Sequence, residues 1–209
     1  MNSYFSCAHR VKFDLFRKYH NIAAAGDRHL AEFMPGDTYL LDPETVEKWK
    51  FTLTPVSYRK DDLKQRLERS GRLYRGEEHI ELVSTGEEGV QLVKALCGLG
   101  NKVSNVNLPN YAGQISNLDR NAVVETNALF TRNSVAPVYA GNLPDDIRKL
   151  ILPHVQNHER VYQATIRKDR NLLYEAFEND PLINHRLTAE QIRDLVDEMI
   201  EKTNKYNYL

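Results

Sequence analysis

A surplus of positive charge is missing from this chain. Its 28 lysine and arginine residues stand against 29 aspartate and glutamate residues, which leaves a formal net charge of -1. Proteins that bind DNA or RNA through the phosphate backbone need a basic excess to neutralise it. We therefore expect no nucleic-acid partner.

Cysteine and long apolar runs are also scarce. Cys7 and Cys97 lie far apart and form no CxxC pair, so the sequence predicts neither a disulfide framework nor a structural zinc site. No stretch has the length of a membrane span, and the opening residues lack the apolar run of a signal peptide. These absences predict a cytoplasmic protein without a membrane partner.

The 209 residues, 41% of them hydrophobic and 27% charged, are enough for one sizeable core. Apolar residues recur at helical spacing over residues 10–19, which predicts an amphipathic helix. Ser84 and Glu87 have the spacing of a capping box before a second helix that ends near Gly98. The charged segment "RKDDLKQRLERSG" predicts a solvated helix that ends at its glycine, Gly71.

Residues that favour β-structure follow. The stretches "KVSNVNLP", "AVVETNALF" and "SVAPVYAG" predict three strands, the last at an edge because Pro137 cannot donate to a ladder. From Pro144 onward the pattern is helical, with breaks at Pro153 and near Pro181 and a last helix that starts at Thr188, capped with Gln191. The predicted fold class is α+β, helix-dominated with a small antiparallel or mixed sheet, in one compact body.

The stretch "GDRHLAEF" places a carboxylate, a guanidinium and an imidazole side by side. In a pocket, Asp27 could act as a base, Arg28 could grip an anionic or hydroxylated substrate, and His29 could donate a hydrogen bond. The alternative is structural: Asp27 caps the helix that follows, and Arg28 pairs with Glu32 four residues on. Residue types alone favour the structural alternative.

Neutral amides are concentrated in "NVNLPNYAGQISNL". Amides donate and accept hydrogen bonds at once, which suits sugar hydroxyls. Composition alone favours the other interpretation, in which Asn105, Asn110 and Asn117 satisfy the backbone of a turn. His154 and His158 share a helical face but lack a third metal ligand, so a surface face is the better interpretation. No GxGxxG, P-loop or GxSxG sequence occurs.

Longer stretches carry a resemblance. "HRVKFDLFRKYHNIAAAGDRHLAEFMP" and "NVNLPNYAGQISNLDRNAVVETNALF" resemble the carboxy-terminal region of glycoside hydrolase family 4, in its α-galacturonidase-like branch. "EEGVQLVKALCGLG", "SVAPVYAGNLP" and "EAFENDPLI" fit the same region, so the resemblance covers nearly the whole chain. It implies the fold of that family's carboxy-terminal domain, which is related to lactate and malate dehydrogenases, over residues 1–209.

The resemblance implies an unusual glycosidase that depends on NAD and on a divalent metal, usually manganese. The sugar is oxidised at C3, a base removes the C2 proton, the glycosidic group is eliminated, water adds, and the hydride returns. By the same resemblance, Asp27 is the catalytic acid/base candidate, Arg28 and His29 contact a sugar such as an α-galacturonide, and Asn110 lies at the pocket rim.

Family features that are missing from the sequence give further expectations. The amino-terminal NAD-binding Rossmann domain and the family's metal-holding Cys and His are absent, and Cys7 and His9 do not reproduce those metal motifs. We therefore expect a fragment or one half of a split enzyme, inactive alone, whose partner is a second copy or a separate amino-terminal half. One alternative is a non-catalytic fragment or oligomerisation module that keeps the fold. A weaker alternative is a relative of the hydroxy-acid dehydrogenases, and the stretch "GDRHLAEF" argues against it.

Overall fold

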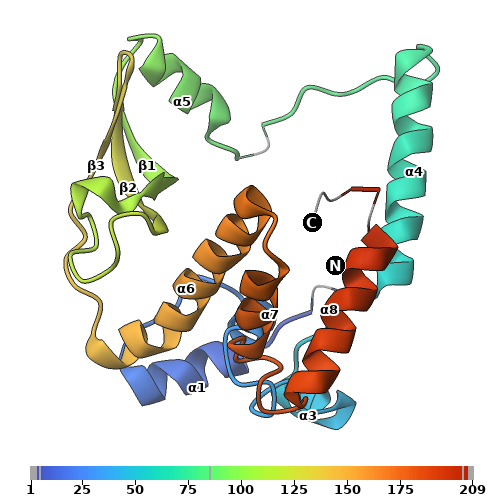
Figure 1. Cartoon of the computed structure of the whole chain (residues 1–209). Helices are drawn as coiled ribbons and strands as arrows, with labels where there is room; N and C mark the ends of the chain where they lie inside the picture. Colours follow the sequence, from blue (N-terminus) through green and yellow to red (C-terminus); the bar gives the residue numbers. More distant parts are fainter. Residues whose placement is uncertain (1–3, 5, 85, 204, 207–209) are drawn as a thin grey trace.

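The structure is a computed structural model that describes residues 4, 6–84, 86–203 and 205–206. Three short helices near the amino terminus surround one apolar cluster (Figure 1). Helix α1 (Arg10–Tyr19) has the bounds that its apolar spacing predicts. Helices α2 (Asp27–Glu32) and α3 (Pro43–Trp49) follow. The cluster between them consists of Val11, Leu15, Ala31, Met34, Tyr39 and Phe51.

Helix α3 lies in the charged segment, where no separate helix was expected. Asp42 provides its cap, because the carboxylate accepts a hydrogen bond of 2.7 Å from the backbone N–H of Thr45 and Pro43 occupies the first turn. Within the cluster, the Tyr39 hydroxyl donates to the Asp14 carboxylate at 2.7 Å. Burial and this bond raise the pKa of Tyr39 above its usual range, so the hydroxyl stays protonated at neutral pH.

Helix α4 (Val56–Tyr74) continues past the glycine at which the sequence predicted its end. Gly71 keeps helical geometry, and the chain turns at Gly76, whose φ of 73° lies in the left-handed region that glycine tolerates. None of the residues of α4 is buried. The predicted solvated helix is therefore confirmed, and its predicted end is wrong.

Helix α5 (Gly89–Leu96) begins later in the sequence than the predicted capping box of Ser84 and Glu87 would place it. Ser84 lies in the irregular segment before it, and Glu88 takes the cap position without a capping hydrogen bond from its own side chain. The Glu88 carboxylate instead contacts Lys102 and Ser104 of the first strand, which lowers the pKa of Glu88. The Ser84 prediction is wrong because strand contacts, not local capping, position this helix start.

The three strands form one antiparallel sheet in the order β1-β2-β3, from β1 (Lys102–Pro109), β2 (Val123–Thr131) and β3 (Ser134–Pro137). A 3₁₀ turn, η2 (Asn110–Ala112), opens the loop between β1 and β2. Buried and exposed residues alternate along β2, and Ala128 and Phe130 pack against Ala95 of α5. The sequence predicted all three strands and the edge position of the third.

The last third of the chain is helical: α6 (Asp145–Arg167), α7 (Arg170–Glu178) and α8 (Ala189–Thr203). Helix α6 runs through Pro153, so the break predicted there is wrong, whereas α7 does end before Pro181. The capping box of α8 is confirmed in both directions. The Gln191 N–H donates to the Thr188 hydroxyl at 3.2 Å, and the Thr188 N–H donates to the Gln191 amide oxygen at 2.9 Å.

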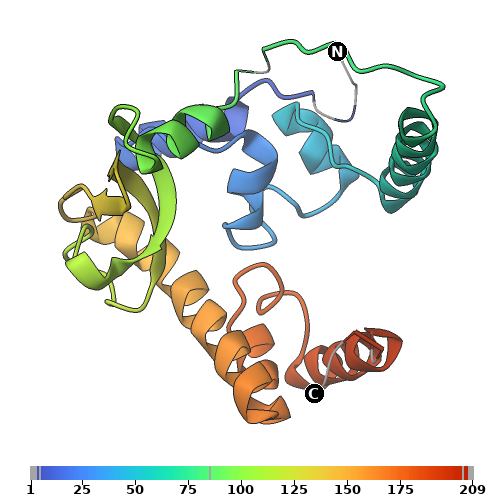
Figure 2. The same ribbon diagram turned by 90° about the horizontal axis from the view of Figure 1, so that it is seen from above.

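The predicted fold class is confirmed, and a single domain over residues 1–209 stays a prediction. Among the residues that the structure describes, the buried apolar side chains form four separate clusters. Figures 1 and 2 show that α4 and the sheet lie on opposite sides of the molecule, and that α6 runs from the sheet end of the molecule toward α7. Apolar side chains of α4, such as Leu63 and Leu67, consequently stay exposed. No described helix is long and apolar enough to cross a membrane.

Candidate active site

Asp27 is the first residue of α2 and is fully buried, at 0% exposure. Gly26 takes the cap position of α2, and no side chain caps that helix, so the prediction that Asp27 caps the following helix is wrong. The carboxylate instead reaches the start of α1, where its Oδ1 accepts a 3.0 Å hydrogen bond from the Lys12 backbone N–H. That N–H belongs to the first helical turn and has no partner inside its own helix. Oδ2 is buried without a hydrogen-bond partner.

The two neighbours of Asp27 point to other partners. The Arg28 guanidinium is half-buried and donates to the Thr54 hydroxyl at 2.5 Å. The His29 imidazole is exposed and lies 3.4 Å from the Glu32 carboxylate. The expected pairing of Arg28 with Glu32 is therefore replaced by a pairing of His29 with Glu32. A guanidinium and an imidazole with this access are suited to an anionic ligand.

Asn110 is fully buried and holds the loop between β1 and β2 together. Its amide N–H₂ group donates to the carbonyls of Ile115 (2.8 Å), Leu118 (3.2 Å) and Asp119 (3.1 Å), and its amide oxygen accepts from the Ile115 N–H at 2.9 Å. The interpretation that this amide satisfies turn backbone is confirmed. The contact of Asn110 with substrate stays a prediction. The amide of its side chain already forms hydrogen bonds with the backbone of the loop.

Asn117 and Gln114 also form hydrogen bonds with backbone groups. Asn117 exchanges two hydrogen bonds with the backbone of Leu143, at 2.8 and 2.9 Å, and Gln114 donates to the Pro109 carbonyl at 3.1 Å. Asn105 lies exposed on strand β1 and not in the turn, so the interpretation that it satisfies turn backbone is wrong. The amide-rich sequence is therefore an ordered loop that is braced by its own side chains.

The two histidines of α6 have different neighbours. His154 contacts the backbone carbonyl of Phe33 through Nε2 at 3.1 Å, which links α6 to the end of α2. His158 lines a pocket of about 840 Å³ beside Pro109 and Tyr111. Neither belongs to a metal-ligand cluster in the described part of the chain.

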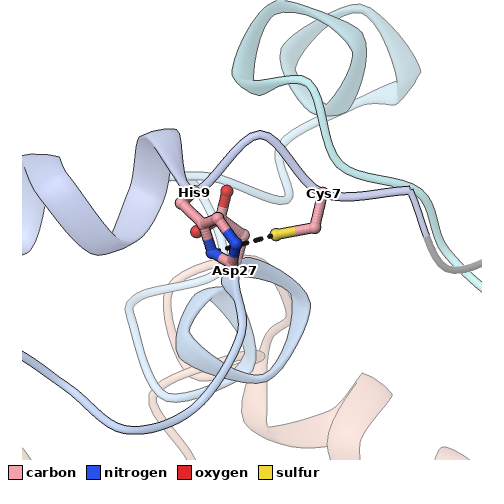
Figure 3. Close-up of side chains that lie close together, drawn as sticks. All are labelled: Cys7, His9 and Asp27. Atoms are coloured by element: carbon pink, nitrogen blue, oxygen red, sulfur yellow. Dashed lines mark hydrogen bonds between the residues drawn. The ribbon is translucent and has the colours of Figure 1, made fainter.

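A cluster that sequence reasoning missed lies beside Asp27. The Cys7 thiol, the His9 imidazole and the Asp27 carboxylate each place a donor atom within 4.8 Å of the others (Figure 3). The Cys7 sulfur lies 3.6 Å from His9 Nδ1. The C-x-H spacing was visible in the sequence, but the approach of Asp27 depends on the contact between α1 and α2. Cys97 is exposed and lies outside the cluster.

A second pocket, of about 1110 Å³, lies between the amino-terminal helices and the segment after α7. Leu41, Phe51 and Leu182 are among its lining residues, and Glu32 and Arg186 bring opposite charges to it. None of the four predicted site residues lines this pocket or the one beside Tyr111. Asp27, Arg28 and His29 lie together in the first turn of α2, whereas Asn110 lies in the loop after β1, so α2 is the candidate site.

Comparison with known proteins places these features in a family. The model of the family 4 glycosyl hydrolase C-terminal domain matches residues 1–183. The chain belongs to glycoside hydrolase family 4. It is 55% identical over 206 residues to an alpha-galacturonidase of Thermoanaerobacterium saccharolyticum, across 99% of this chain and 44% of that relative.

Solved structures of family 4 enzymes have the same fold. The crystal structure of LplD from Bacillus subtilis matches with a TM-score of 0.86 and 46% identity, over 95% of this chain and 44% of LplD. A 6-phospho-alpha-glucosidase from gut microorganisms, solved in complex with NAD and Mn²⁺, matches with a TM-score of 0.68 and 21% identity, over 92% and 41% of the two chains. This family 4 chain thus spans less than half the length of the relatives it matches.

Proposed function

We propose that this chain is the sugar-binding, carboxy-terminal part of an NAD- and divalent-metal-dependent glycosidase that acts on α-galacturonides. The observation that carries the proposal is the 55% identity to an alpha-galacturonidase over 99% of the chain. The activity requires the remaining half of the enzyme, on the same or on a second polypeptide. A non-catalytic, oligomer-forming role is the alternative, which the exposed apolar side chains of α4 and α5 would favour.

The residues present do not fit NAD. Dinucleotide sites of the Rossmann type use a glycine-rich turn between a parallel strand and a helix, and the described strands form a single antiparallel sheet. NAD supplies hydride chemistry where it is bound, and we assign no such step to these residues. What they contribute is contact with the sugar and transfer of a proton.

Asp27 is the candidate for proton transfer. Its carboxylate is oriented by the Lys12 N–H through Oδ1, which leaves Oδ2 available to take or give a proton. Arg28, beside it, is the candidate for the uronate carboxylate, because a guanidinium matches a carboxylate with two parallel hydrogen bonds. His29 would hold a further sugar oxygen, and Asn110 would act by keeping its loop ordered.

Reconstitution tests this function. The isolated chain, supplied with NAD, Mn²⁺ and an aryl α-galacturonide, is expected to release no phenol. Addition of the amino-terminal half of the Thermoanaerobacterium saccharolyticum alpha-galacturonidase, which this chain does not match, is expected to produce phenol release. The measurement is absorbance of the released phenol, with each half alone as control. Phenol release by the isolated chain would overturn the proposal, and so would a stable complex of both halves that releases no phenol.

A further inference from the structure

The three side chains beside α1 and α2 suggest a site that sequence reasoning had set aside. We propose that Cys7, His9 and Asp27 bind a divalent transition-metal ion of the zinc class. The site is separate from the metal motifs expected in the amino-terminal half, and its residues all lie in the chain described above. The inference concerns binding and does not depend on the proposed glycosidase activity.

The first argument is the separation of the donor atoms. In a tetrahedral zinc site, with Zn–S of about 2.3 Å and Zn–N of about 2.0 Å, the sulfur and nitrogen lie about 3.5 Å apart. Cys7 Sγ and His9 Nδ1 are 3.6 Å apart. The third donor atom, a carboxylate oxygen of Asp27, lies within 4.8 Å of both, so a side-chain shift of the order of 1 Å would complete three ligand positions.

The second argument is the unsatisfied oxygen of Asp27. A carboxylate oxygen that is buried without a partner is costly, because it has lost water and gained nothing. Oδ2 of Asp27 is in this condition, whereas Oδ1 is anchored by the Lys12 N–H. A cation at the cluster would satisfy Oδ2, and the anchored Oδ1 would orient the ligand, as outer hydrogen bonds do in metal sites.

The backbone around the cluster is held in place. Cys7 forms an isolated antiparallel bridge with Phe51, supported by hydrogen bonds from the Ala8 N–H to the Lys50 carbonyl (3.0 Å) and from the Thr52 N–H to the Ser6 carbonyl (3.2 Å). The backbone at Cys7 is therefore positioned without the metal. Figure 3 shows the three side chains facing one another at the start of α1.

The donor set indicates which ions fit. One thiolate, one imidazole and one carboxylate suit Zn²⁺ and its spectroscopic substitute Co²⁺, whereas Mn²⁺ and Mg²⁺ prefer oxygen ligands. Three protein ligands leave a fourth position open, and the exposed His9 makes that position accessible.

One consequence does rest on the proposed function. An oxygen bonded to the ion cannot accept a proton, so Zn²⁺ at this site should inhibit the reconstituted enzyme by occupying Asp27. Inhibition and binding are measured separately, and absence of turnover would not affect the binding result.

Cobalt titration of the reduced chain tests the site. We expect a thiolate-to-cobalt charge-transfer band in the near ultraviolet that saturates at one equivalent and that Zn²⁺ abolishes by displacement. Cys97→Ser should keep the band, because this second thiol is exposed and outside the cluster. Cys7→Ser should remove it, and Asp27→Asn should weaken cobalt binding about tenfold or more, as loss of a ligand or of its support does.

His9→Gln provides a second variant, since the His9 side chain is exposed and its replacement leaves the apolar cluster intact. Circular dichroism of each variant confirms the fold. A band that survives Cys7→Ser and disappears in Cys97→Ser would overturn the proposal, as would the absence of a band at millimolar cobalt in the folded, reduced chain.

Discussion

Asp27→Asn is expected to lower kcat/KM of the reconstituted enzyme about 100- to 10,000-fold, the range that a positioned acid/base group contributes. Asparagine has the shape of aspartate and keeps an oxygen that can accept the Lys12 N–H, the bond that carboxylate makes at 3.0 Å. The fold should therefore be preserved while the proton-transfer oxygen is lost. Assays in zinc-free buffer separate this effect from occupation of the site by metal.

The matched control is Glu125→Gln, which neutralises an exposed carboxylate on β2 and should leave kcat/KM unchanged. Urea unfolding of both variants shows whether stability has moved. If Asp27→Asn kept kcat/KM within about threefold of the parent, a proton-transfer role worth several kcal/mol would be contradicted. The buried carboxylate would then serve α1 as a cap alone.

Asn110→Ala is expected to destabilise the sheet and its loop by about 3 kcal/mol. The substitution removes the partner of three backbone carbonyls and of one backbone N–H, all at a buried position. Each buried polar group left without a partner costs about 1–3 kcal/mol, and part of the loop backbone will recover water. The effect should concentrate in residues 110–119.

Hydrogen exchange measures this most directly, because the four apolar clusters need not unfold together. The amides of the loop in Asn110→Ala should lose protection, together with the adjoining ends of β1 and β2. Asn105→Ala, an exposed amide of β1, should show no such loss. Equal protection in the two variants would mean that the loop is held by other contacts.

Elements set by local rules could be predicted from the sequence. Apolar periodicity located α1 to the residue, residues that favour β-structure located β2, and the reciprocal bonds of Thr188 and Gln191 confirmed a capping box. The same rule failed at Ser84, because Glu88 contacts the first strand and the helix starts later. Pro153 shows a second limit of prediction from local rules. Helix α6 continues through this proline although its backbone has no N–H to donate.

What could not be predicted depends on contacts between distant segments. Asp27 was placed at a helix start, but the helix that its side chain serves is α1, fifteen residues earlier. The Cys7–His9–Asp27 cluster depends on the same approach of two helices, so C-x-H spacing alone does not identify it.

The most direct measurement of the central claim, that this half of the enzyme holds the uronide, is substrate preference in the reconstituted enzyme. kcat/KM is compared for an aryl α-galacturonide and the matching neutral α-galactoside, in the parent and in Arg28→Gln. Loss of a charge-assisted pair worth about 1.5–3 kcal/mol should reduce the preference for the uronide about 10- to 100-fold. Thr54→Val, which removes only a contact of the guanidinium, should keep the preference. A preference that Arg28→Gln leaves unchanged would contradict the account.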